Sequence, residues 1–279
     1  MSSLQKAFEH CETIAKSHYE NFPIGWFVPK PSRKYLYAIY AFARTADDFS
    51  DEAQFRQDGL KHLEDFEVRL EKASKGNVSE DDLLFWAISE TLQRTGIPSK
   101  LLKDLLIAFK MDLTKNRYQS YQELETYCVY SANPIGRIVL LLYGYTDPQL
   151  HLWSDKICTG IQLVNHWQDI AVDLKKDRVY LPKEDMDRFA YTYEDLLAHR
   201  LNDSFSSLLR FEISRARSLF LEGKPLLKSL EWRLRLQITL MWKGPMYILD
   251  LIEKNQYDVF QKRPKISKRD LFKLLFKRF

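Results

Sequence analysis

Two acidic stretches, whose carboxylates recur every three or four residues, constrain this chain most. The first runs from Arg44 to Glu52 and places Asp47 and Asp51 four residues apart, as it does Asp48 and Glu52. The second repeats the spacing with the polar side chains of Gln162, Asn165, Asp169, Asp173 and Asp177. Side chains at these spacings share one face of an α-helix. The sequence therefore predicts two helices that each present a carboxylate stripe.

This pair of stripes predicts a site for hard divalent cations and a diphosphate. Mg²⁺ takes oxygen ligands, keeps several waters and completes its shell with substrate phosphates. The alternative is that each stripe is a solvated helix surface, which is the usual place for acidic runs. Two observations favour the site: apolar and aromatic residues flank both stripes, and the second stripe contains Gln162 and Asn165, whose amide oxygens a solvated surface would not need.

Helical spacing also dominates the rest of the chain. Strict alternation of apolar and polar residues is scarce, and only nine Gly and ten Pro interrupt the 279 residues. Helix-start patterns, in which a hydroxyl precedes a carboxylate or amide by three residues, occur at Ser79, Ser120, Thr146 and Thr192. No linker divides the chain, so we expect one all-α domain over residues 1–279, with about ten helices around a central cavity.

The cysteines and the apolar runs indicate a cytoplasmic protein or one attached to the inner face of a membrane. Cys11, Cys128 and Cys158 are odd in number and lack metal-ligand spacing, so we expect buried thiols and no disulfide framework. No run approaches the ~18 apolar residues that span a bilayer, and no signal peptide opens the sequence.

Positive charge gathers at the C-terminal end. Residues 262–279 carry eight basic side chains and one acid, Asp270, whereas the net charge of the whole chain is only +4. On a helix, one face of this segment would hold Leu271, Phe272, Leu275, Phe276 and Phe279. A basic amphipathic helix can lie on an anionic lipid surface. Docking on the protein's own body is the alternative, and nucleic-acid binding is not expected because no such motif accompanies the basic residues.

A diphosphate held by Mg²⁺ is a good leaving group, because the metal offsets the charge that develops on it. Its departure from an allylic or cyclopropylcarbinyl carbon leaves a carbocation, which must be kept from water until it has been directed. An apolar cavity lined by aromatic rings meets that need, and 14% of the residues are aromatic. Arg44, Arg178 and Tyr180 lie next to the stripes in the sequence and can reach phosphate oxygens.

These segments together resemble the squalene/phytoene synthases, the head-to-head trans-isoprenyl diphosphate synthase family. The resemblance runs from about Ser17 to Phe260, and it rests on the segments 44–52, 127–136 and 162–182. Within the family, the segments 17–23, 43–48, 165–174 and 257–264 are similar to the bacterial hydroxysqualene synthases of hopanoid biosynthesis. The resemblance implies the isoprenoid-synthase (terpenoid synthase) helical bundle.

The resemblance also implies a role for each residue of the stripes. Metal ligands, directly or through water, would be Asp47, Asp48, Asp51, Asp169 and Asp173, with Glu52, Gln162 and Asn165 supporting metal or diphosphate. The diphosphate would be held by Arg44, Arg178 and Tyr180, together with Gln162 and Asn165. Tyr127 would face the reacting carbons and act with Asp48 and Asp169 in catalysis, although a packed core tyrosine is the alternative. Asp112 stands where the family has an acid, and we expect His166 to be structural.

Two departures from the wider family favour its hydroxysqualene branch. Gln168 stands where Arg is usual and Val172 where Glu is usual, so the site has one fewer cation and one fewer carboxylate. A site that condenses two farnesyl diphosphates must balance two diphosphates, whereas ionising presqualene diphosphate involves one. The sequence therefore predicts a hydroxysqualene synthase, a carbon–oxygen lyase that uses Mg²⁺ and captures the cation with water. The segment 17–20 also departs from the condensing enzymes, so its phosphate contacts stay unassigned.

Two other functions stay open. A condensing prenyltransferase would make presqualene diphosphate, squalene, phytoene or dehydrosqualene from two prenyl diphosphates. A non-catalytic helical scaffold on the same fold is the second, and the two intact acidic motifs argue against it. The sequence contains neither a G-x-G-x-x-G dinucleotide fingerprint nor a Glu-x-x-His pair of the kind that binds two irons in helical bundles.

Overall fold

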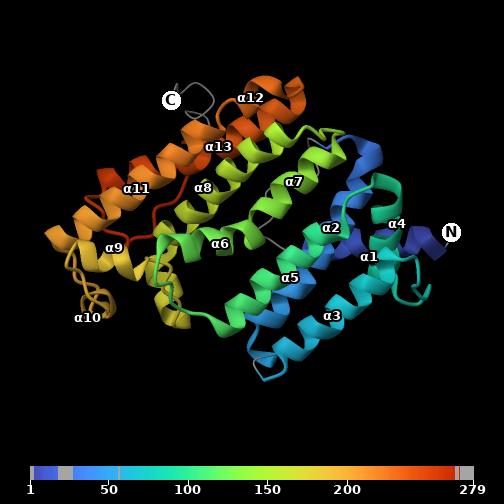
Figure 1. Ribbon diagram of the computed structural model, residues 1–279, viewed down its shortest axis with the longest axis horizontal. Helices are drawn as coiled ribbons and strands as arrows, with labels where there is room; N and C mark the ends of the chain where they lie inside the picture. Colours follow the sequence, from blue (N-terminus) through green and yellow to red (C-terminus); the bar gives the residue numbers. More distant parts are fainter. Residues whose placement is uncertain (1–2, 18–27, 56, 268–269, 271–279) are drawn as a thin grey trace. The chain divides into compact units, whose positions relative to one another are not determined.

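The computed structural model describes residues 3–17, 28–55, 57–267 and 270, and these residues form an all-α protein (Figure 1). The α-helices are α1 (Ser3–Ser17), α2 (Lys30–Asp51), α3 (Gly59–Ser74), α4 (Leu83–Thr95), α5 (Ser99–Thr114), α6 (Tyr121–Ser131), α7 (Asn133–Leu142), α8 (Pro148–Asp173), α9 (Lys183–Arg188), α10 (Tyr193–Leu197), α11 (Asp203–Gly223), α12 (Leu226–Ser229) and α13 (Trp232–Lys254). The 3-10 helices are η1 (Ala53–Phe55) and η2 (Leu174–Lys176). The predicted fold class is confirmed, with more helices than the ten or so expected.

The helices divide into two compact units. Unit 1 comprises Met1–Thr114 and Pro134–His151, and unit 2 comprises Lys115–Asn133 and Leu152–Phe279. The first acidic stretch lies in unit 1 and the second in unit 2. The single domain over 1–279 and its central cavity therefore stay predictions.

Unit 1 is built around α2, which contacts α1, α3, α4 and α5. Small and apolar residues line the inward side of α2, and Phe42 of this side is fully buried. Its ring packs 5.2 Å from Phe66 and 5.9 Å from Phe85, and the last two rings lie 4.7 Å apart, measured between centroids. Because four helices pack on α2, the polar residues on its remaining face hold fixed positions.

Side-chain caps precede some of the helices, and two of the four predicted caps are wrong. Two are confirmed: Ser120 before α6 and Thr192 before α10. For α4 the cap is Asp82, whose carboxylate accepts from Phe85 N, and Ser79 lies outside the helix. For α8 the accepting oxygen belongs to Asp147 rather than Thr146, because the helix begins at Pro148, a residue suited to the first helical position.

In unit 2, α8, which carries the second acidic stretch, packs closely against α11, and α11 in turn contacts α13. Gly160 of α8 faces the ring of Phe220 on α11, and Gly223 of α11 lies directly over the backbone of α8. The indole of Trp242 on α13 donates to the carbonyl of Phe220 at 2.8 Å. The position of α8 is therefore set by close helix–helix contact.

The remaining sequence expectations have mixed outcomes. Cys11 and Cys128 are buried and Cys158 is half-buried, and none of the three forms a disulfide. None of the helices in the part of the chain that the structure describes is long and apolar enough to span a bilayer. Residues 268–269 and 271–279 of the predicted basic amphipathic segment lie outside the described residues, so that segment stays a prediction.

Gly223→Ala is expected to destabilise the protein by roughly 1–3 kcal/mol, the usual cost of overpacking a core. An added Cβ would stand 2.6 Å from Ile157 Cγ1 and 2.7 Å from the carbonyl oxygen of Trp153. Urea unfolding measures the change. Ser218→Ala at an exposed site on the same helix is the control, and equal stability of both variants would contradict a tight α8–α11 contact.

Candidate functional site

The first acidic stripe lies on α2, where an arginine already binds two of its carboxylates. Arg44 Nη1 lies 3.1 Å from Asp47 Oδ2, and Nη2 lies 2.9 Å from Asp48 Oδ1. Asp47 and Asp48 are half-buried, whereas Asp51, the last residue of α2, and Glu52, its C-cap, are exposed. The guanidinium offsets the repulsion between carboxylates on the same turn.

The second stripe lies on α8 and is shorter than the sequence predicts. Asp169 and Asp173 are half-buried one turn apart, and the helix ends at Asp173. Asp177 follows a 3-10 turn with a left-handed φ of 57° and binds the Arg117 guanidinium, with Nη2 to Oδ1 at 2.5 Å. The prediction that Asp177 extends the stripe is therefore wrong, because the helix stops one turn before it. At the other end, Asn165 is exposed.

A second arginine binds this stripe from far away in the sequence. The Arg263 guanidinium contacts both carboxylate oxygens of Asp169, with Nη2 to Oδ2 at 2.9 Å and Nε bound to Oδ1. The neighbouring Gln168 is buried, and its Nε2 donates to the carbonyl oxygen of Pro264. Gln168, which replaces the usual Arg, therefore carries no charge and ties α8 to the C-terminal segment. Val172, which replaces the usual Glu, is exposed.

Buried aromatic rings gather beside the second stripe. The Tyr180 ring stacks on His166, with centroids 3.6 Å apart and planes at 15°. Tyr127 and Tyr118 lie 5.8 Å and 5.7 Å from Tyr180, and each of these four rings is buried. Burial first, and then the charge of Arg178, lower the pKa of His166 to about 3, so the imidazole is neutral. We call these four residues the aromatic wall; Gln162 reaches it, with Nε2 3.4 Å from His166 Nε2.

The segment that carries Arg178 and Tyr180 is anchored along its length. Val179 N donates to the carbonyl of Asn116 at 2.9 Å, and Lys183 N donates to that of Tyr118 at 2.9 Å. Val179 and Arg117 form the isolated parallel bridge of the structure's described part. Contacts between two segments that are about 60 residues apart in sequence thus fix the direction of the diphosphate-binding candidates.

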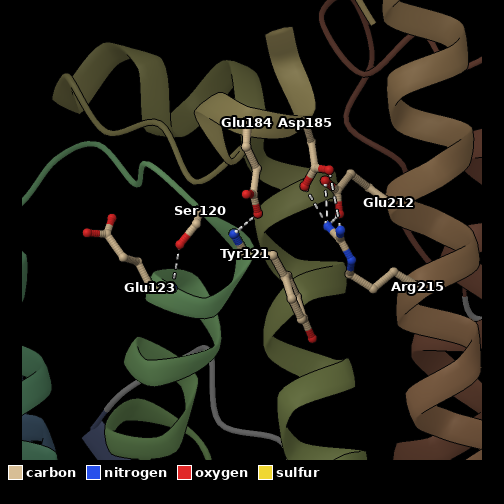
Figure 2. Close-up of polar contacts among 7 residues, drawn as sticks. All are labelled: Ser120, Tyr121, Glu123, Glu184, Asp185, Glu212 and Arg215. Carbon is tan, nitrogen blue, oxygen red and sulfur yellow. Dashed lines mark hydrogen bonds and ion pairs between the residues drawn. The ribbon is translucent and has the colours of Figure 1, made fainter. Parts of the chain in front are cut away.

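Behind this segment lies a buried ionic cluster (Figure 2). Arg215 of α11 lies 2.8 Å from Asp185 Oδ2 and 2.8 Å from Glu212 Oε2, and both acids are buried. Its guanidinium also lies 4.0 Å from the centroid of the Tyr121 ring. Glu184, next to Asp185, accepts a hydrogen bond from Tyr121 N at 2.6 Å. The cluster therefore joins α6, α9 and α11 just after Pro182.

Two further features belong to unit 1. Asp112 is half-buried on α5 of unit 1. A cavity of about 760 Å³ in unit 1 is lined by residues such as His10, Phe49 and Arg69, and it includes none of the predicted site residues. It is therefore not the predicted diphosphate site.

Comparison with known proteins identifies the family. Residues 14–270 match the squalene/phytoene synthase family. The chain belongs to this family. The 15-cis-phytoene synthase of Synechococcus elongatus is 29% identical over 94% of this chain and 89% of its own length. The hydroxysqualene synthase of Rhodopseudomonas palustris is 33% identical over 80% of this chain and 75% of its own length.

A solved structure supports the same family and its fold. The crystal structure of squalene synthase HpnC from Alicyclobacillus acidocaldarius aligns with a TM-score of 0.87 and 36% identity, covering 91% of this chain and 96% of that one. The predicted isoprenoid-synthase fold is thus confirmed. The family's members are synthases that process prenyl diphosphates, so this protein is an enzyme of that kind.

The carboxylates on each stripe fit a magnesium ion that shares its shell with a substrate. Among the residues that the structure describes, no group of three or more His, Cys, Asp or Glu is gathered as a metal site. Each stripe instead presents neighbouring carboxylates, and Mg²⁺ is commonly held by one or two carboxylates together with waters and substrate phosphates. The donor set suits that cation, while the predicted clamp between the two stripes stays a prediction.

Several contacts in this region could not be predicted from the sequence. Arg263 and Arg117 reach their carboxylates from 94 and 60 residues away, so no local pattern signals them. His166 was expected to be structural, and it is indeed buried; its stacking on Tyr180 has no signature in the spacing of the two residues. The spacing of Glu212 and Arg215 in the sequence allows an i,i+3 ion pair, but nothing in that spacing indicates that the pair is buried.

The ionic cluster makes stability depend on pH. Burial, and then the nearby Asp185, raise the pKa of Glu212 from its ordinary 4.5 to about 8, although Arg215 lowers it. The folded protein therefore holds a proton that the unfolded chain releases. Stability from this group is full below about pH 4.5 and is lost as the pH rises to about 8.

Glu212→Gln should remove this dependence, because the amide resembles the protonated acid. Between pH 5 and 8 the wild type is expected to lose up to about 1.4 kcal/mol per pH unit relative to the variant. Urea unfolding at several pH values measures the difference. Glu222→Gln, at an exposed site on the same helix, is the control, and parallel pH profiles for wild type and Glu212→Gln would refute the bound proton.

Proposed function

We propose that the protein is a hydroxysqualene synthase that ionises presqualene diphosphate. The carbon–oxygen bond breaks, the diphosphate leaves with the electron pair, and the cyclopropane ring opens. Water adds to the resulting cation and loses a proton, which gives hydroxysqualene. The reaction consumes one water and releases diphosphate, and it needs no reductant such as a nicotinamide cofactor. Two similar proteins support the proposal: a hydroxysqualene synthase that is 33% identical to this chain, and a squalene synthase of solved structure that is 36% identical to it.

The observation that carries this proposal is the uncharged, buried Gln168. Its amide is engaged with the carbonyl of Pro264, so it adds no cation at a position where the wider family usually has arginine. Of the arginines near the stripes, Arg44 and Arg263 are paired with stripe carboxylates. Few positive charges near the stripes are therefore left to bind phosphate, and this suits a site for one diphosphate better than a site for two.

We assign the roles within the site as follows. Metal ligands, directly or through water, are Asp47, Asp48, Asp51, Asp169 and Asp173, with Glu52 and Asn165 in support. Diphosphate contacts come from Arg44, Arg178, Tyr180, Gln162 and Asn165. Bound Mg²⁺ would offset the charge on the departing diphosphate. Arg178 suits the leaving group because a planar guanidinium binds phosphate oxygens bidentately.

The aromatic wall suits the carbocation. Ring faces of Tyr127 and Tyr180 can stabilise positive charge without offering a strong nucleophile. The lowered pKa of His166 keeps its ring neutral, so it does not repel the cation. Tyr127 is accordingly proposed to face the reacting carbons.

Membrane attachment through residues 262–279 is a separate part of the proposal. The described start of this segment is held by the protein itself: Ile266 lies against Gly244, and Tyr247 donates to Asp270 Oδ1 at 2.8 Å. Lipid contact would therefore fall to residues beyond Asp270, which lie outside the described residues. A cytoplasmic enzyme docked on the inner membrane face would meet its hydrophobic substrate there.

Asp48→Asn and Asp169→Asn should each reduce turnover of presqualene diphosphate at least about a hundredfold while the fold is kept. Each change preserves shape and removes a charge that the cation needs. Steady-state rates at saturating Mg²⁺ and circular dichroism measure the two effects. Asp81→Asn and Glu194→Gln remove exposed carboxylates and should leave the rate within about twofold; near-normal rates for both site variants would refute the stripe assignment.

Product analysis separates the hydroxysqualene synthase from its alternatives. Purified protein with Mg²⁺ should convert presqualene diphosphate to an alcohol without a nicotinamide cofactor, and it should be poor at joining two farnesyl diphosphates. Mass spectrometry of the extracted products measures both. Efficient formation of presqualene diphosphate, phytoene or dehydrosqualene would identify a condensing synthase instead, and inactivity with every prenyl diphosphate would favour the scaffold.

A further inference from the structure

The C-terminal segment 258–267 is tied to the second stripe at two adjacent residues of α8. Asp169 binds the Arg263 guanidinium through both oxygens, and Gln168 donates to the carbonyl oxygen of Pro264. Gln168 and Pro264 are buried, whereas Arg263 is exposed. The segment therefore has one buried and one accessible attachment at the stripe.

The base of the segment is held independently of these two contacts. After α13, Gln256 and Tyr257 adopt left-handed φ values of 53° and 65°, which turn the chain. Val259 is buried, and the Phe260 ring packs 4.8 Å from Phe205. These contacts keep the segment on unit 2 when the arginine contact changes.

Arg263 and a cation need the same atoms. A bidentate guanidinium occupies both oxygens of Asp169, and a directly bound metal ion requires at least one of them. The two therefore compete. The arginine of the first stripe differs. Arg44 lies on α2 itself, one turn from Asp47 and Asp48, so its release from these carboxylates would not free a distant segment of the chain.

We propose that Arg263 is a latch that holds the segment 258–267 on the second stripe and yields when a cation binds Asp169. This rests on the proposed function only in assigning a cation to Asp169. The hydrogen bond between Gln168 and Pro264 keeps the segment in place while the Arg263 guanidinium leaves Asp169, so only the residues near Arg263 are released. Arg263 thereby lowers the metal affinity of the stripe and links metal binding to the mobility of the segment.

The first test measures binding of Mn²⁺ alone, as a paramagnetic substitute for Mg²⁺, to the full-length protein without substrate. Arg263→Gln should bind Mn²⁺ about twofold to fivefold more tightly than wild type, a factor that corresponds to losing one partly exposed ion pair. Arg263→Lys, which keeps the charge but loses the fork, should fall between them. Lys262→Gln, an exposed neighbour, removes a charge from the same segment and should bind as wild type does.

The second test follows hydrogen exchange of the amides in 262–267, which follow the packed Val259 and Phe260. Mn²⁺ should speed this exchange in wild type, and Asp169→Asn should speed it without metal, whereas Glu194→Gln should not. Unchanged or weaker Mn²⁺ binding by Arg263→Gln would overturn the latch and leave the proposed function standing if the stripe variants are inactive. Failure of wild type and Arg263→Gln alike to bind Mn²⁺ would overturn the latch, whereas the proposed function is decided separately by the product analysis with presqualene diphosphate.

Discussion

Pairing between arginine and the stripe carboxylates is the interaction on which the organisation of this protein depends. Carboxylates on successive turns of one helix repel one another, and a site for a cation must nevertheless keep them together. On α2, Arg44 from the same helix offsets this repulsion. On α8, Arg263 from the C-terminal end of the chain does so by pairing with Asp169. The folded protein can therefore hold its acidic residues in place before any cation arrives.

Sequence periodicity predicted the helical class and the two stripes well, because spacing along one helix is a local property. It failed where a helix ends: Asp177 has the spacing of the stripe, yet α8 stops at Asp173 and the left-handed turn sends Asp177 to Arg117 instead. Contacts over long sequence separations, such as that of Arg263 with Asp169, depend on how the chain returns, and no local pattern carries that information.

Some features of the candidate site could likewise be predicted from the sequence, and others could not. The candidate carboxylates could be selected from residue type and spacing, and their role as metal ligands stays a prediction; the family match supports the chemistry they suit. The neutral state of His166 could not, since it arises from burial against Tyr180 and from the charge of Arg178. Likewise, the sequence shows only that Gln168 lacks the charge of the usual arginine. The structure shows that its amide binds the carbonyl of Pro264 and so holds the C-terminal segment on α8.

The ionic cluster around Arg215 has a consequence for calorimetry. Since Glu212 is protonated in the folded protein and ionised in the unfolded chain near pH 7, unfolding releases a proton to the buffer. The heat of that transfer adds to the measured enthalpy and depends on the buffer's own heat of ionisation. Melting enthalpies in phosphate and in Tris will therefore differ although the protein and its melting reaction are the same, and the difference counts the protons that Glu212 and its neighbours exchange.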